Sequence, residues 1–246
     1  MLSQLALMAA TMLTPPGPPP KNGEELIREM HQRYAGKWYS TLTFIQKTTQ
    51  ASGTVETWYE ALQLPGFLRI DIAPLDSGKA IIFRNDSIYQ LNQGKIRSSA
   101  PLIHPLMVLG FDVYLDTPEH TIEKLRILTF DLSKIHADVW QGKPVYVVGA
   151  DSGDANSPQF WVDQKDLLFV RTIRPNQQGG VNETQFNKYV KLGNAWLSPE
   201  VLFFTNGQPG AKEEYSDWKI GMTFRGDLFD PVKFGRAAWI SGGRER

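Results

Sequence analysis

The chain lacks cysteine altogether, and its 246 residues carry no excess of either charge. Without cysteine the sequence can form no disulfide bond, no thiolate metal site and no lipid-modified cysteine anchor. The 26 Lys and Arg residues balance the 26 Asp and Glu residues, so the formal net charge is zero. Nucleic-acid binding proteins carry a basic footprint, and we therefore expect no nucleic-acid partner.

Long hydrophobic runs are also missing. The longest, Leu2–Leu13, has roughly a dozen residues, whereas a spanning helix needs about 20. A proline-rich stretch, Thr14–Pro20, follows it. We interpret residues 1–14 as a signal-peptide-like segment and residues 15–22 as a spacer, which predicts an exported, periplasmic protein. The alternative is that the segment stays uncleaved and anchors the protein to the membrane, since no Lys or Arg precedes the apolar run.

The common signatures of catalysis are absent from the sequence. It contains no Gly-x-Ser-x-Gly elbow, no His-Glu-x-x-His motif and no phosphate-binding loop that ends in Lys-Ser or Lys-Thr. Its four histidines, His31, His104, His120 and His136, do not have the spacing of metal ligands. We therefore predict no catalytic residues, no metal site and no cofactor, so that the protein is not an enzyme.

What the sequence does contain is a long series of strand patterns. In Thr54–Leu64, one side carries Glu56, Trp58, Glu60 and Leu62, and the intervening residues form the other. Alternation with period two is typical of a β-strand. Pro65-Gly66 interrupts the pattern, and Phe67–Ile72 resumes it, which predicts a hairpin.

The remaining patterns predict an antiparallel meander with few helices. Asn22–Ala35 reads as a helix capped by Asn22, and two apolar segments in mid-chain, Pro101–Leu109 and the segment from Thr117-Pro118 onward, read as short helices. Short turns separate the strands, which favours antiparallel pairing. The other predicted strands are Trp38–Thr49, Ala80–Arg84, Ser87–Leu91, Ile135–Trp140, Pro144–Ala150, Gln159–Asp163, Leu167–Arg174, Val181–Leu192, Trp196–Thr205 and Lys212–Ile220.

This order resembles the LolA/LolB-type family of outer-membrane lipoprotein carriers. The resemblance covers roughly residues 24–235 and is carried by short motifs: Ala35-Gly36 with Phe44-x-Gln46, Leu64-Pro-Gly-Phe-Leu-Arg-Ile-Asp71, Phe160-Trp-Val-Asp163, Val170-Arg171, Thr184-x-Phe186-x-x-Tyr189 and Gly193-x-x-Trp196-x-x-Pro199. It implies a mainly β (α+β) fold: an incomplete antiparallel β-barrel of about eleven strands with an N-terminal helix and a mid-chain helical lid. We expect a single domain over residues 23–240, with a polar tail at residues 241–246.

The sequence departs from the family at one position. The carriers place an arginine immediately before the proline of this hairpin, where it bonds the lid; here the residue is Leu64. Arg69, on the following strand, matches a frequent but less specific arginine. We take Arg69 as the candidate polar contact to the lid or to a ligand.

A curved sheet with a helical lid predicts a concave apolar wall. The candidate lid residues are Leu102, Leu106 and Leu109. Two interpretations of the wall stay open: an open cavity that binds acyl chains, or a solid core packed against the N-terminal helix and the mid-chain insertion. The candidate wall residues are Trp58, Leu62, Leu68, Ile70, Ile81, Phe83, Phe186 and Phe203, with Tyr146, Val148, Phe169 and Val201 as further candidates.

The favoured hypothesis is a monomeric, non-catalytic carrier that shelters a lipid or lipoprotein cargo, with an acyl-bearing lipoprotein or glycolipid as ligand. The alternative is an envelope sensor or protein-interaction module on the same fold. Seven Trp and the polar loop Asn206–Lys212 motivate that alternative, in which the partners are envelope proteins. An enzyme remains the third and least favoured hypothesis.

Overall fold

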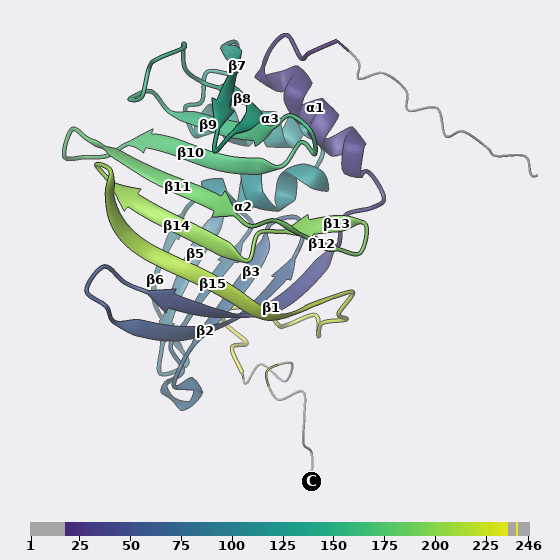
Figure 1. Cartoon of the computed structure of the whole chain (residues 1–246). Helices are drawn as coiled ribbons and strands as arrows, with labels where there is room; N and C mark the ends of the chain where they lie inside the picture. Colours follow the sequence, from purple (N-terminus) through teal and green to yellow (C-terminus); the bar gives the residue numbers. More distant parts are fainter. Residues whose placement is uncertain (1–17, 236–239, 241–246) are drawn as a thin grey trace, which may run out of the picture.

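The computed structural model describes residues 18–235 and residue 240, and the folded part is dominated by one large sheet (Figure 1). The predicted signal-like segment 1–14 and the tail 241–246 lie outside the described residues. Within the described residues, three α-helices and two short 3-10 helices accompany the sheet: α1 (Gly23–Tyr34), η1 (Leu75–Ser77), α2 (Pro105–Gly110), η2 (Asp112–Tyr114) and α3 (Pro118–Ile127).

Thirteen strands pair antiparallel, in the order β6-β5-β4-β3-β2-β1-β15-β14-β11-β10-β9-β8-β7, and β12 and β13 form a separate hairpin. Because β6 and β7 stand at opposite ends of this order, the sheet is open, and the predicted mainly β, incomplete-barrel fold is confirmed. The strands are β1 (Thr41–Thr49), β2 (Val55–Gln63), β3 (Phe67–Ile72), β4 (Ala80–Arg84), β5 (Ser87–Asn92), β6 (Lys95–Pro101), β7 (Ile135–Trp140), β8 (Lys143–Val148), β9 (Gln159–Asp163), β10 (Phe169–Pro175), β11 (Val181–Asn187), β12 (Val190–Leu192), β13 (Ala195–Leu197), β14 (Glu200–Thr205) and β15 (Gln208–Ile220).

The prediction of about eleven strands was too low. It missed β6, because both faces of this edge strand are exposed and no apolar alternation marks it. It also merged β11 with β12 and β13 with β14. Lys188, with φ at 59°, breaks the first pair, and the Ser198 hydroxyl, which donates to the carbonyl of Asn187, lies at the second break.

Helix starts were predicted well where a polar side chain caps them. The Asn22 Oδ1 accepts a hydrogen bond from the Glu25 amide at 2.8 Å, and the Thr117 Oγ1 accepts one from the His120 amide at 3.3 Å. No such cap marks α2: Pro105 begins it after β6 has ended, so the predicted helix at Pro101–Leu109 starts too early.

The helices cover only part of the concave face of the sheet. In Figure 1, α1 and α3 lie over the end of the sheet that contains β7 to β10, while α2 lies between the two halves of the curve. The core of the covered half is solid: Leu26, Ile27 and Met30 of α1 have no exposed surface, and neither has Phe160 of β9. The half built from β1 to β4 has no such helix against it, and this difference positions the candidate site.

Candidate functional site

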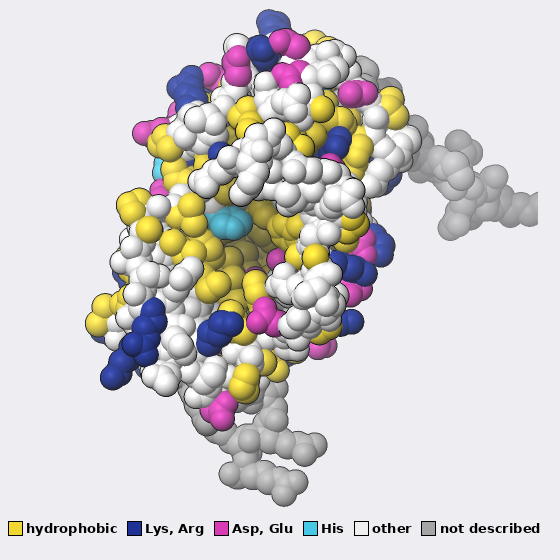
Figure 2. Space-filling model, turned by 90° about the vertical axis from the view of Figure 1, so that its left-hand side faces the viewer, with side chains coloured by type: hydrophobic (Ala, Val, Ile, Leu, Met, Phe, Trp, Pro, Cys, Tyr) yellow, Lys and Arg dark blue, Asp and Glu magenta, His cyan; other side chains and the backbone are white. Residues whose placement is uncertain are grey.

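A cavity of about 280 Å³ opens on the uncovered half of the concave face. Figure 2 shows it as a hollow lined by hydrophobic side chains, with a histidine at its rim. Its volume is at the low end of the range of small-molecule sites, roughly 300–1,000 Å³. The lining comes from β1 to β4, α2, β11, β14 and β15: Phe44, Gln46, Trp58, Glu60, Leu62, Leu68, Ile70, Ile81, Phe83, His104, Leu106, Met107, Phe111, Phe186, Phe203, Glu213 and Tyr215.

The structure places all eight principal wall candidates on this lining: Trp58, Leu62, Leu68, Ile70, Ile81, Phe83, Phe186 and Phe203. Strand alternation explains how one face collects them, since neighbouring strands pair in register and every second side chain faces the same side. Leu62 pairs with Leu68, and Leu68 pairs with Phe83.

The four further candidates lie elsewhere. Val148, Phe169 and Val201 have no exposed surface, and half-buried Tyr146 packs against the same main core. Around Val148 the packing is so close that a Cβ placed on Gly23 of α1 would lie 2.6 Å from one of its methyl groups. Each of the two interpretations of the wall therefore describes one half of the sheet: a solid core where α1 and α3 cover it, and a hollow where they do not.

The three lid candidates lie in three different environments. Leu106 lines the cavity. Leu109, three residues further along α2, is fully buried in the main core. Leu102 precedes α2 and is 40 % exposed, outside the cavity.

Four polar side chains on the cavity wall were missed as site residues: Gln46 of β1, Glu60 of β2, and Glu213 and Tyr215 of β15. Glu60 lies on the same face of β2 as Trp58 and Leu62. The alternation that predicts those two on the wall therefore predicts Glu60 there as well. Only 5 % of Glu60 is exposed. Buried carboxyl groups are usually paired or hydrogen-bonded, whereas Glu60 has no hydrogen-bond or ion-pair partner among the described residues and borders the cavity.

Burial dominates the electrostatics of this polar group. It raises the pKa of Glu60 well above its ordinary value, and the neighbouring Glu213 raises it further. It also raises the pKa of Glu213 to about 7, although the Tyr215 hydroxyl donates a hydrogen bond to Glu213 Oε2 at 2.9 Å. Within the described part of the chain, no Lys or Arg lines the cavity to compensate these carboxyl groups.

His104 stands at the start of α2 and also lines the cavity. Its ring meets the edge of Phe83 with centroids 5.0 Å apart, and burial lowers its pKa to about 4. The Nδ1 atom is buried and has no hydrogen-bond partner among the described residues. The imidazole is therefore neutral at physiological pH, with one unsatisfied polar atom at the apolar lining.

A carboxylate connects the lid region to the Pro65-Gly66 hairpin. Asp112, two residues after α2, is 2 % exposed, and its Oδ1 accepts a hydrogen bond from the Gly66 amide at 3.0 Å. This contact joins the same two elements that the carrier family joins through an arginine, which Leu64 replaces here. The bonding groups are reversed: the hairpin donates from its backbone, and the lid region accepts.

Arg69, predicted as a contact of the lid or ligand, lies on the other face of the sheet. It is 2 % exposed, forms a bidentate ion pair with Asp71 at 2.8 and 2.9 Å, and donates to the carbonyls of Leu228 and Gly235. Its guanidinium carbon lies 4.3 Å from the centre of the Phe234 ring. Arg69 therefore fixes the C-terminal segment to the convex face and does not line the cavity.

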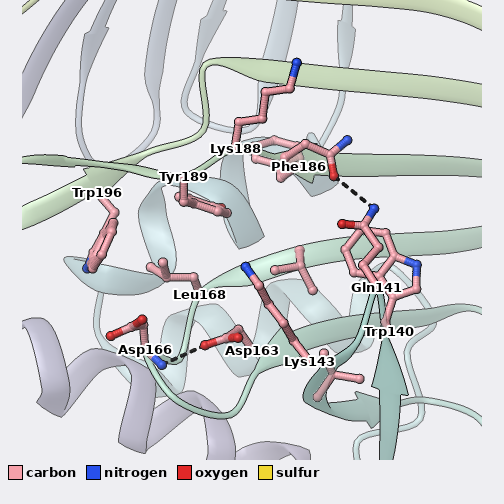
Figure 3. A pocket seen from close by; sticks show the side chains of 13 residues that line it. Trp140, Gln141, Lys143, Asp163, Asp166, Leu168, Phe186, Lys188, Tyr189 and Trp196 are labelled. Atoms are coloured by element: carbon pink, nitrogen blue, oxygen red, sulfur yellow. Dashed lines mark hydrogen bonds between the residues drawn. The ribbon is translucent and has the colours of Figure 1, made fainter.

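A second pocket, of about 300 Å³, lies near the β12–β13 hairpin (Figure 3). Its aromatic residues are Trp140, Phe186, Tyr189 and Trp196, and Asp163 and Lys143 also line it. In Figure 3 the Lys143 side chain extends into this pocket. Compared with the first cavity, its lining is more polar and carries charges of both signs.

The described residues contain no group of three or more His, Asp or Glu side chains placed to hold a metal ion. None of their helices combines the length and the apolar character that crossing a membrane requires.

Comparison with solved structures identifies relatives of the fold. A putative outer-membrane lipoprotein-sorting protein domain from Vibrio parahaemolyticus has a TM-score of 0.56 at 14% identity, over 85% of this chain and 97% of that one. A DUF1329 family protein from Desulfovibrio piger gives 0.55 at 12% identity, over 85% and 95%. The LolA superfamily protein NE2245 from Nitrosomonas europaea gives 0.50 at 10% identity, over 85% and 97%.

Comparison by sequence identifies no relative: no protein-family model matches the chain, and no curated protein matches it closely. At 10–14% identity the structural likeness shows the fold alone. It extends over nearly the whole length of each related structure, so it is not confined to a shared hairpin or half-sheet. The chain therefore has the LolA-like fold.

Proposed function

We propose that this protein is a non-catalytic binding or carrier protein of the cell envelope, which shelters the acyl chain of a lipoprotein or glycolipid in the cavity beneath α2. The observation that carries the proposal is the hollow itself: thirteen of its seventeen lining residues are hydrophobic or histidine, and it opens to solvent on one side (Figure 2).

The hollow is large enough for a useful affinity. Burial of one methylene contributes about 0.8 kcal/mol. A chain segment of a few methylenes against Leu62, Leu68 and Ile70 therefore gives measurable binding, and a longer chain that extends past the rim adds little. Reversible capture of one acyl chain is the behaviour expected of a carrier.

The lid contributes adaptable surface. Leu106 and Met107 of α2 both face the cavity. Methionine is unbranched and polarizable, so it adjusts to chains of different shape. We propose that α2 shifts when a chain enters, with the Gly66–Asp112 hydrogen bond holding it near the hairpin.

The envelope assignment draws support from two sources. The Vibrio structure is named a putative outer-membrane lipoprotein-sorting protein domain, and it shares the fold. The apolar run Leu2–Leu13 and the proline-rich stretch after it have the character of an export signal and a spacer.

Native mass spectrometry of the protein purified from bacterial cells tests the proposal. We expect a bound species that adds the mass of a single-chain or acylated molecule, and uptake of the neutral dye Nile red by the delipidated protein. Leu106→Trp, which fills the cavity from the lid, should abolish both signals. Leu102→Trp serves as the control because its side chain lies outside the cavity. A homogeneous unliganded mass together with no dye uptake contradicts the proposal.

The second pocket favours the alternative of a protein-interaction module, since Trp and Tyr are enriched in binding hot spots. Under this alternative the Trp140–Trp196 pocket binds a segment of an envelope protein (Figure 3). Cross-linking in envelope extract distinguishes the two: a single protein partner lost in Trp196→Ala but kept in Leu106→Trp supports the interaction module, and the reverse pattern supports the carrier.

A further inference from the structure

The polar group inside the cavity faces an apolar wall and has no cationic partner. Glu60, Glu213, Gln46 and Tyr215 come from three adjacent strands, β2, β1 and β15, and lie on one face of the sheet. Gln46 pairs across the ladder with Tyr215, and Thr48 pairs with Glu213. The group therefore forms one continuous patch beside the hydrocarbon-like surface of Leu62, Leu68 and Ile70.

Two of its donors are already used, but the acceptors of Glu60 are not. The Gln46 Nε2 donates to Thr48 Oγ1 at 2.8 Å, and the Tyr215 hydroxyl donates to Glu213 Oε2. The carboxyl group of Glu60 borders the cavity and has no hydrogen-bond partner among the described residues. Across the cavity, the Nδ1 atom of His104 is unpartnered as well.

At pH 8 Glu213, whose burial raises its pKa to about 7, is ionised, and with no Lys or Arg among the lining residues it repels an anion that enters. A ligand that supplies N–H or O–H donors to the two carboxyl groups gains hydrogen bonds at this patch without that repulsion. A carboxylate or phosphate head meets the repulsion and supplies no such donor.

We propose that the patch selects the head of the ligand, so that the cavity binds lipids whose head is uncharged and carries hydroxyl or amide donors, and rejects fatty acids and anionic phospholipids. This inference rests on the proposed function and narrows it. The N-acyl amide of a lipoprotein and the hydroxyls of a glycolipid both have the required chemistry, whereas a free carboxylate does not.

Displacement of Nile red from the delipidated full chain by three probes with the same alkyl chain tests the inference. The probes are laurate, N-lauroylethanolamine and dodecyl glucoside, each used below its micelle concentration at pH 8. We expect both neutral probes to bind at least about tenfold more tightly than laurate, a difference of roughly 1.4 kcal/mol.

The variant Glu60→Gln/Glu213→Gln should bring laurate closer to the neutral probes, because it removes the like charge and keeps the shape. Glu214→Gln, a neighbouring carboxylate that does not line the cavity and pairs with Lys212, is the matched control and should keep the wild-type preference. The wild-type ranking gives a result even if the double variant does not fold.

Two failures are distinguishable. If all three probes bind equally, or if laurate binds best, the head-group inference is wrong while the carrier function stands. If none of the probes binds and Nile red is not taken up, the proposed function fails and the inference fails with it.

Discussion

The backbone amide of Gly66 donates a hydrogen bond to the buried Oδ1 of Asp112, and this single contact ties the β2–β3 hairpin to the lid region. Asp112 lies two residues after the end of α2, so a change at its carboxyl group acts close to the lid. Burial raises the pKa of Asp112 to about 7, and it outweighs the lowering effects of the Gly66 hydrogen bond and of Lys124, while Asp116 and Asp86 add to the rise.

The first prediction concerns the pH dependence of stability at this contact. The pKa of Asp112 is 3.8 in its ordinary state and about 7 in the fold. Between these values the folded state binds more protons, so the contribution of Asp112 to stability is fully present below about pH 4 and is lost as the pH rises through 7. Asp112→Asn keeps the acceptor and removes the ionisation, and it should unfold at a higher urea concentration than the wild type at pH 8.

Urea unfolding at pH 5 and pH 8 measures this difference. Glu60 and Glu213 are unchanged in both proteins, so the change in pH slope between them isolates Asp112. Asp112→Ala leaves the Gly66 amide without its partner and should cost about 1–3 kcal/mol at pH 5, and less at pH 8, where it also removes the ionised carboxylate. Equal pH slopes for the wild type and Asp112→Asn would contradict the assignment.

The second prediction separates two leucines on the same helix. Leu109→Ala should cost about 2–5 kcal/mol, because it empties a fully buried position in the core. Leu106→Ala should cost about 1 kcal/mol or less, because its side chain already borders a hollow. Nile red uptake should change in Leu106→Ala. The folded fraction of Leu109→Ala should take up the dye as the wild type does. Chemical denaturation and Nile red titration measure the two effects, and similar stability losses would show that Leu106 is a core residue.

The third prediction concerns the close approach of α2 to Phe186. A Cβ on Gly110 would lie 2.8 Å from Cε1 of the Phe186 ring, which is 3 % exposed and also lines the cavity. Gly110→Ala should destabilise the protein by about 1–3 kcal/mol through overpacking, in spite of the better helix propensity of alanine. Phe186→Leu should restore part of the loss in the double variant, as a thermodynamic cycle would measure. Additive losses would mean that the two residues do not interact.

The fourth prediction concerns the attachment of the C-terminal segment. Arg69→Ala leaves Asp71 buried and unpaired and should cost about 3–5 kcal/mol. It should also expose the segment from Leu228 to Gly235 to limited proteolysis, because two of its carbonyls lose their donor. Arg97→Ala on exposed β6 should change stability by no more than about 0.5 kcal/mol. An intact segment in the Arg69 variant would contradict this role.

Much of the fold follows from the local sequence pattern, and particular residues show what this pattern cannot predict. Trp58, Leu62 and Phe83 were identifiable as one wall because alternation fixes the face of a strand. Alternation does not show which half of a sheet a helix covers, so Val148 and Phe169 had the same signal as Phe83. Their burial depends on how α1 packs, which is a tertiary property.

Arg69 illustrates a second limit. Its position between Leu68 and Ile70 puts it on the opposite face of β3, but the carbonyls that accept its hydrogen bonds belong to Leu228 and Gly235, far along the chain. Edge strand β6 illustrates a third limit, because a strand with two exposed faces carries no hydrophobic period. In the first two cases the missing information lies in contacts between segments distant in sequence, whereas β6 pairs only with its neighbour β5.

The pairing of β1 with β15 has a consequence for how the molecule folds. Ile45 pairs with Ser216, which lies 171 residues further along the chain. Pairings of such long range form slowly because the intervening chain must be ordered first. Until β15 pairs with them, the meander from β1 to β6 and the meander from β7 to β14 are separate sheets, and the backbone groups of their edge strands β1 and β14 are unpaired. Glu213 and Tyr215 come with that closing strand, so this part of the cavity lining forms only when β1 and β15 pair.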